Sequence, residues 1–324
     1  MGNKETFIIK VSKADFGKRL DVLISDRNKN SRTFIAGLIR NGHILVNEAI
    51  KKPSYRVIIG EIISCTIPPL KRLLFDPEPI PINILYEDNE VLIINKPPGL
   101  VVHPAPGNYS GTLVNGLLHY YPELENNENN IRPGIVHRLD KNTSGVLVVA
   151  KNANAHNSLA AQFKNRKVKK LYIALVYGNF KLNEGVVELS IGRHPVNRKK
   201  MSTVTKKGRY ARTFWKVLEE YQGATLIELG LDTGRTHQIR VHCAAIGHPV
   251  MGDPVYCSSK AYKNFIIDQK TAIKIISLKR QMLHARRLSF THPVSKQELF
   301  VKAPLPADMK EIIQILRQHL LARG

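Results

Sequence analysis

Apolar residues recur every three or four positions in residues 18–25 and 31–42, which predicts two short helices near the start of the chain. Ser31 is a suitable N-cap for the second of them. Apolar, β-branched runs at residues 44–46 and 62–67 predict two strands that follow. Together these patterns predict a small unit of two helices and a hairpin.

Prolines then interrupt the pattern. Five of them fall within residues 68–81, at Pro68, Pro69, Pro77, Pro79 and Pro81. Proline removes a backbone donor and favours extended chain, so this density predicts a linker. We therefore expect a small N-terminal domain at residues 1–70, a linker at residues 71–82 and a larger domain at residues 83–324.

Short apolar runs dominate the larger domain. They predict strands at 91–95, 100–102, 146–151, 171–177, 186–189, 213–217, 224–229, 287–290 and 299–301. Helical spacing is found at residues 112–121, at residues 155–166 and in a final helix from residue 308, and residues 233–242 read as a strand end, a tight glycine turn and the start of a helix. Many strands mixed with few helices favour an α+β domain built on a mostly antiparallel sheet.

The most distinctive polar stretch lies at residues 137–145, immediately before the apolar run at residues 146–150. It holds one carboxylate, Asp140, among cationic and hydroxyl side chains. A loop that enters a buried strand is held rigidly, as a catalytic carboxylate requires. Asp140 is therefore the candidate nucleophile. The alternative is that Asp140 only caps a turn and pairs with a neighbouring cation.

The net charge of +23 indicates a polyanionic partner, and nucleic acid is the first candidate. Cations gather in two regions that would contact phosphates. They are Arg32, Arg40, Lys51 and Lys52 in the N-terminal unit, and Arg193, Arg198 and Lys199 in a loop of the larger domain. We find no signal peptide and no apolar run near the ~20 residues that span a bilayer. A cytoplasmic protein without membrane contact is expected.

The three cysteines are widely spaced and form no metal-binding pair, so we expect no metal site. A phosphate-cradling glycine loop and a nucleophilic serine or cysteine elbow are also missing from the sequence. One nucleophilic aspartate acting on RNA without a cofactor fits a short list of reactions, which includes breaking and remaking a glycosidic bond. The target base would have to leave its stack, and a planar side chain such as Tyr172 could receive it. The other reading of Tyr172 is a core residue on a strand.

Several segments together resemble the RluA-type pseudouridine synthases. The segments are His137-Arg138-Leu139-Asp140 with Thr143-Ser144-Gly145, Asn95-Lys96-Pro97, Val102-His103-Pro104, residues 170–174, residues 234–242 and Gly252-Asp253-Pro254. Residues 1–70 resemble an S4 RNA-binding domain. Within the family the chain is most similar to the RluD branch, which acts on the helix 69 stem-loop of large-subunit ribosomal RNA.

The resemblance implies a pseudouridine synthase fold and a cofactor-independent isomerase that converts uridine to pseudouridine. Asp140 would attack C6 of the base or C1′ of the sugar, or would abstract a sugar proton. Tyr172 would stack on the uracil and help to take the C5 proton. Arg235 would pair with Asp140, and Arg138 would enter the RNA where the base has left.

The resemblance makes large-subunit ribosomal RNA, or its assembly particle, the expected partner. The mixed charges of the surface lead us to expect a monomer. Two alternatives stay open at this point. One is a synthase that acts on transfer RNA or another ribosomal site, and the other is a non-catalytic RNA-binding assembly factor. We interpret His137, His237 and His242 as structural residues rather than bases.

Overall fold

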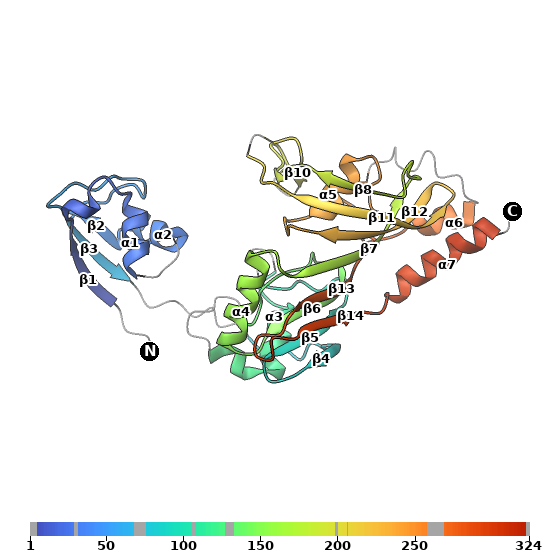
Figure 1. Cartoon of the computed structure of the whole chain (residues 1–324), viewed down its shortest axis with the longest axis horizontal. Coiled ribbons are helices and arrows are strands. Elements are labelled where there is room, and N and C mark those ends of the chain that lie inside the picture. The colour runs from blue at the N-terminus through green and yellow to red at the C-terminus, as the bar shows by residue number, and fades with distance from the viewer. Residues whose placement is uncertain are drawn as a thin grey trace. The chain divides into compact units, whose positions relative to one another are not determined.

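The computed structural model describes residues 5–28, 32–67, 76–104, 108–126, 133–197, 200–205, 207–257 and 269–321. The chain divides into two compact units, Met1–Leu73 and Leu74–Gly324, which are considered separately (Figure 1).

The N-terminal unit packs two helices on a small antiparallel sheet. Its elements are β1 (Glu5–Lys10), α1 (Leu20–Asn28), α2 (Arg32–Arg40), β2 (Ile44–Val46) and β3 (Ile62–Ile67). The sheet order is β1-β3-β2. Both predicted helices and both predicted strands are present, whereas β1 was not anticipated. Only alternate residues of β1 face the core, since Ile9 is buried and Ile8 is 70% exposed, and this short run lacks a strong apolar signal.

The second unit contains the large sheet. Its strands are β4 (Ile84–Glu87), β5 (Val91–Lys96), β6 (Ser144–Ala150), β7 (Lys169–Tyr177), β8 (Glu184–Glu188), β11 (Arg212–Tyr221), β12 (Ala224–Leu231), β13 (Leu283–Thr291) and β14 (Glu298–Lys302). The strand order is β4-β5-β6-β13-β7-β12-β11-β8, with β14 also paired to β13. Strands β6 and β13 run parallel, whereas β5–β6, β7–β13, β7–β12 and β11–β12 are antiparallel. The predicted mixed, mostly antiparallel sheet is confirmed.

The helices of this unit are α3 (Leu113–Tyr120), α4 (Ala153–Lys164), α5 (Gln238–Ala245), α6 (Gln269–Ile276) and α7 (Ala307–Leu321). A short hairpin, β9 (Gly192–Arg193) with β10 (Met201–Ser202), frames the cationic loop, and a 3-10 turn, η2 (Pro122–Asn126), follows α3. Figure 1 shows α4 beside the β5–β6 side of the sheet, and α6 and α7 beyond β12.

Both faces of the sheet are covered. Alternate residues of β6 and β7 enter one core with α3 and α5. Their intervening residues enter two further cores, one with α4 and one with α6 and α7. Strand β6 is buried along its whole length, which confirms the prediction of a strand enclosed on both faces. The loop that precedes it is therefore fixed to the centre of the sheet.

The junction of β6 with β13 depends on a glycine. Gly145 has a φ of 116°, and its Cα partner in β13 is Ala285. A Cβ atom at Gly145 would lie 2.1 Å from the carbonyl oxygen of Ala285. The two backbones can approach this closely only because position 145 has no side chain.

Two segments differ from what the sequence pattern predicts, one in the expected strand at residues 100–102 and one in the expected linker at residues 71–82. Residues 100–102 form no strand, and Val101 makes only an isolated bridge to Thr112. Residues 76–83 have no regular structure but lie along α3, where the Asn115 amide donates to the Asp76 carbonyl. No helix in the described part of the chain is long and apolar enough to cross a membrane.

Candidate active site

The loop that carries Asp140 is fastened at several points. The Asp140 carbonyl accepts a hydrogen bond from the Thr143 amide at 3.0 Å, which closes a turn. The Thr143 hydroxyl accepts from Gln281, and the Asn142 carbonyl accepts from Arg280. Because Arg280 and Gln281 come from a distant part of the chain, Asp140 is held in place by tertiary contacts as well as by β6.

Lys96 fastens the same loop from the end of β5. Its ammonium lies fully buried and donates to the carbonyls of Pro97, Leu100 and Lys141, at 2.7, 2.8 and 3.0 Å. Burial lowers the pKa of Lys96 to about 7, while the nearby charge of Asp140 opposes that shift. Three carbonyl acceptors match the three donors of an ammonium group, so Lys96 joins two loops at the site.

Asp140 is oriented by an arginine that the sequence analysis had given no role. Nη1 of Arg240, in the first turn of α5, donates to Oδ2 of Asp140 at 3.0 Å. The other two nitrogens of the Arg240 guanidinium, Nε and Nη2, donate to the Asp253 carboxylate at 2.7 and 2.9 Å. The Asp253 side chain is fully buried and also accepts from the backbone amides of Val255 and Tyr256. A two-pronged ion pair of this kind fixes the direction of the remaining nitrogen.

Arg235 does not occupy the predicted position. Its Nε donates to the Tyr210 carbonyl at 3.2 Å, and the guanidinium that contacts Asp140 is that of Arg240. The prediction that Arg235 pairs with Asp140 is therefore wrong. Arg235 belongs to the turn before α5, whereas Arg240 lies on the buried face of that helix. Arg240 and its partner Asp253 lie in two of the segments that carry the family resemblance, Gln238-Ile239-Arg240 and Gly252-Asp253-Pro254. The sequence alone does not show that these two side chains are in contact.

Tyr172 lies on β7 between Leu229 of β12 and Ala285 of β13. It is 9% exposed and lines a small cavity of about 100 Å³ together with Asp140 and Arg235. Burial, and secondarily the charge of Asp140, raise the pKa of Tyr172 above its usual value. The hydroxyl is therefore protonated at neutral pH, and it would have to lose that proton before it could accept one from a substrate.

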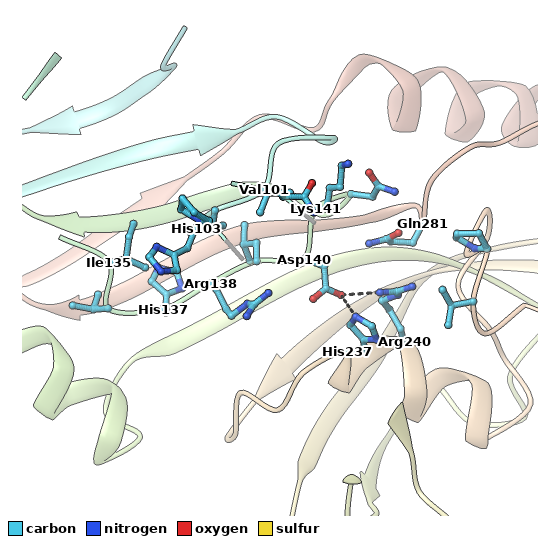
Figure 2. A pocket seen from close by; sticks show the side chains of 18 residues that line it. Val101, His103, Ile135, His137, Arg138, Asp140, Lys141, His237, Arg240 and Gln281 are labelled. Carbon is cyan, nitrogen blue, oxygen red and sulfur yellow. Dashed lines mark hydrogen bonds and ion pairs between the residues drawn. The ribbon is translucent and has the colours of Figure 1, made fainter. Parts of the chain in front are cut away.

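A larger cavity of about 670 Å³ adjoins the small one and is also lined by Asp140. Figure 2 shows the Asp140 carboxylate projecting toward His237 and Arg240, with a contact to each. Arg138 is exposed and lines both cavities, beside the carboxylate. The cavity is large enough for a nucleotide and has cations at its wall, so it can receive a base turned out of an RNA stack.

Two of the three histidines interpreted as structural are held by hydrogen bonds to the protein backbone or side chains. Nε2 of His137 accepts from the Val148 amide at 3.0 Å, and its ring stacks on Phe163. Burial, and secondarily the charge of Lys170, lower the pKa of His137 to about 3, so the ring is neutral. His242 is fully buried between the Thr213 hydroxyl and the Leu189 carbonyl. His137 and His237 both line the larger cavity, but only His237 lies next to the Asp140 carboxylate.

The predicted RNA-contacting cations of the N-terminal unit lie on its surface. Arg40 and Lys52 are exposed, and the Lys51 ammonium lies over the Tyr55 ring. Arg32 is also exposed and pairs with the buried Asp21 at 3.3 Å. Arg193 is exposed on β9, whereas Arg198 and Lys199 lie outside the described residues. The interaction of these cations with RNA stays a prediction.

Within the described ranges, no group of three or more His, Cys, Asp and Glu side chains is arranged to hold a metal ion. The side chains at the two cavities include the Asp140 carboxylate, the rings of Tyr172 and His237, and the guanidinium groups of Arg138, Arg235 and Arg240.

Comparison with known proteins identifies the family of the chain. A model of the RNA pseudouridylate synthase family matches residues 90–245, and an S4 domain model matches residues 18–63. An uncharacterized RNA pseudouridine synthase of Bacillus subtilis (strain 168), YlyB, is 42% identical over 96% of this chain and 98% of its own length. The ribosomal large subunit pseudouridine synthase D of Neisseria meningitidis serogroup A is 45% identical over 93% of this chain and 79% of its own length.

A solved structure is also similar. Human RNA pseudouridylate synthase domain containing 4 superposes with a TM-score of 0.57 at 27% identity, covering 72% of this chain and 93% of the human one. The chain therefore belongs to the RNA pseudouridine synthase family, whose members are isomerases acting on RNA, and residues 18–63 form an S4 domain.

Proposed function

We propose that this enzyme isomerises uridines in large-subunit ribosomal RNA, in the loop of helix 69, with Asp140 as the nucleophile. The observation that carries the proposal is the oriented carboxylate. Oδ2 of Asp140 is bound by Arg240, and the side chain is 19% exposed at the wall of a nucleotide-sized cavity. A nucleophile held in one direction meets its electrophile with a smaller loss of entropy.

The substrate is inferred from similarity. Relatives that are 43–45% identical, from Neisseria meningitidis and Nitrosomonas europaea, carry the name ribosomal large subunit pseudouridine synthase D. The motifs around Asp140 also resemble the branch that acts on helix 69. The net charge of +23 fits a substrate rich in phosphates.

The proposed reaction begins when a uridine leaves its stack and enters the cavity, while Arg138 fills the gap in the RNA. The uracil then lies on the ring of Tyr172, which lines the smaller cavity that adjoins the larger one at Asp140. The free oxygen of Asp140 then attacks C6 of the base or C1′ of the sugar, or the carboxylate abstracts a sugar proton. In each route the N1–C1′ bond breaks, the base turns, and C5 bonds to C1′. C5 then loses its proton, N1 gains one and Asp140 is released as a carboxylate, so the reaction is an isomerisation that consumes no cofactor.

The test uses the purified full chain with three RNAs. They are a helix 69 stem-loop, the same stem-loop with its loop uridines replaced by cytidine, and a transfer RNA transcript. Pseudouridine is detected by chemical adduct formation and reverse-transcription stops. We expect modification of the first RNA only. Modification of the transfer RNA alone would overturn the proposed substrate and leave the isomerase chemistry intact.

An Asp140→Asn variant separates chemistry from binding in the same assay. Loss of turnover with nearly unchanged affinity for the stem-loop is expected, since the amide keeps the shape of the side chain but is a poor nucleophile. Turnover by Asp140→Asn would show that the nucleophile is another group.

A further inference from the structure

His237 has a backbone conformation that only a few residue types adopt easily. It is the N-cap of α5, with φ 56° and ψ 21° in the left-handed region. That conformation costs a non-glycine residue roughly 1–2 kcal/mol. The surroundings fix it, because the His237 carbonyl accepts from the Val241 amide and the next side chain, Gln238, is buried and bonded to Thr233 and Thr213. The imidazole is thereby directed into the cavity beside Asp140.

The hydrogen bonds at Tyr256 favour one of the two tautomers of His237. The Tyr256 hydroxyl accepts from the Met201 amide at 2.8 Å and lies 2.8 Å from Nδ1 of His237. The amide has a proton to give and no lone pair, so the single hydroxyl proton has Nδ1 as its acceptor. If Nδ1 carried a proton instead, the hydroxyl proton would need another acceptor, and the described residues provide none.

The ionisation of both groups agrees with this arrangement. Burial raises the pKa of Tyr256, so the hydroxyl keeps its proton. Burial lowers the pKa of His237, and the charge of Arg240 acts in the same direction while that of Asp140 opposes it. A neutral ring that accepts at Nδ1 must carry its proton on Nε2.

Nε2 of His237 faces the catalytic carboxylate. It lies 3.9 Å from Oδ2 of Asp140, the same oxygen that Arg240 binds at 3.0 Å. Oδ1 receives no hydrogen bond from the described residues. An Nε2–H group points a positive edge at the carboxylate, whereas the other tautomer would point a lone pair at it.

We propose that Tyr256 locks His237 in the Nε2–H tautomer, and that His237 acts with Arg240 as a positioning residue that holds Oδ2 of Asp140 and leaves Oδ1 to react. This role rests on the proposed function, since it concerns the same carboxylate. A small movement of the carboxylate on substrate binding would bring the 3.9 Å contact into hydrogen-bond range.

The tautomer is tested without substrate, by ¹⁵N NMR of the histidine rings in the full chain. The His237 signals are assigned by their absence from a His237→Gln variant. We expect an unprotonated Nδ1 and a protonated Nε2, and a mixture of tautomers in Tyr256→Phe. A protonated Nδ1 in the wild type would overturn the proposal. Because no RNA is present, this result is independent of whether the proposed substrate is correct.

The positioning role is tested by two amide variants. The amide nitrogen of His237→Gln can occupy the place of Nε2, whereas that of His237→Asn occupies the place of Nδ1. With a stem-loop that the wild type modifies, we expect His237→Gln to stay close to wild type. His237→Asn should lower kcat by roughly a hundredfold with little change in KM. Asparagine tolerates the left-handed region well, so this decrease would not come from backbone strain. Equal rates for the two variants would overturn the role.

Discussion

At the scale of single residues, the direction of Asp140 depends on a guanidinium that is itself immobilised. The Arg240 side chain is 6% exposed and uses two of its nitrogens to bind Asp253. Lysine can supply charge at this place but cannot form the two-pronged pair and reach Asp140 at the same time. We expect Arg240→Lys to lower kcat by roughly a hundredfold. Arg235→Lys is the control, and it should lower the turnover rate much less than Arg240→Lys does. A larger decrease in Arg235→Lys than in Arg240→Lys would instead support the predicted pairing of Arg235 with Asp140.

His137 predicts how the stability of the fold depends on pH. Its pKa is lowered to about 3 in the folded chain, against an ordinary value near 6.5. Between those values the unfolded chain binds a proton that the folded chain does not. Stability is therefore fully present above pH 6.5 and falls as the pH drops toward 3, by up to about 1.4 kcal/mol per pH unit.

The measurement for His137 is urea unfolding of wild type and His137→Gln at several pH values from 7 to 4. Gln keeps an acceptor for the Val148 amide but does not titrate. Carboxyl groups titrate in this range in both proteins, so the difference between the two curves isolates the histidine. A difference that does not change with pH would contradict the assignment.

At the scale of the elements, the junction of β6 and β13 positions the catalytic loop. In Gly145→Ala the residue keeps a left-handed φ, and its new Cβ would lie 2.1 Å from the Ala285 carbonyl oxygen. We expect this variant to lower the free energy of unfolding by roughly 3 kcal/mol or more. Gly247→Ala is a matched control, since its φ is also positive, at 85°, but no atom lies within 4 Å of the added Cβ. We expect it to cost about 1–2 kcal/mol in thermal unfolding. Equal destabilisation by the two variants would show that the close approach of the two strands is unimportant.

The elements also show what the sequence could predict. The strand β6 was evident because its apolar residues run without interruption and are buried on both faces. Residues 100–102 have the same character but form no strand, since pairing depends on partners far away in the chain. The same limit applies to the site. Asp140 and Tyr172 stood out from local motifs, whereas the hydrogen bond of Arg240 to Asp140 joins residues 100 positions apart and required the fold.

At the scale of the whole molecule, the excess of positive charge predicts binding that weakens with salt. Replacing Arg40 and Lys52 together by alanine should lower RNA affinity and reduce the slope of log K against log salt by roughly 0.7–0.9 for each phosphate that is no longer neutralised. The turnover rate at saturating RNA should stay unchanged. Lys10→Ala with Lys13→Ala removes the same charge from other exposed positions of the unit. If the two double variants changed RNA affinity and its salt dependence equally, Arg40 and Lys52 would not be specific contacts to the RNA.

The most direct test is pseudouridine mapping of total RNA from cells that lack this gene and carry either the wild-type chain or Asp140→Asn. We expect signals in the helix 69 loop of large-subunit ribosomal RNA to disappear on deletion, to return with the wild type and to stay absent with the variant. Their return with Asp140→Asn would contradict the role of Asp140, and signals restored only in another RNA would contradict the proposed substrate.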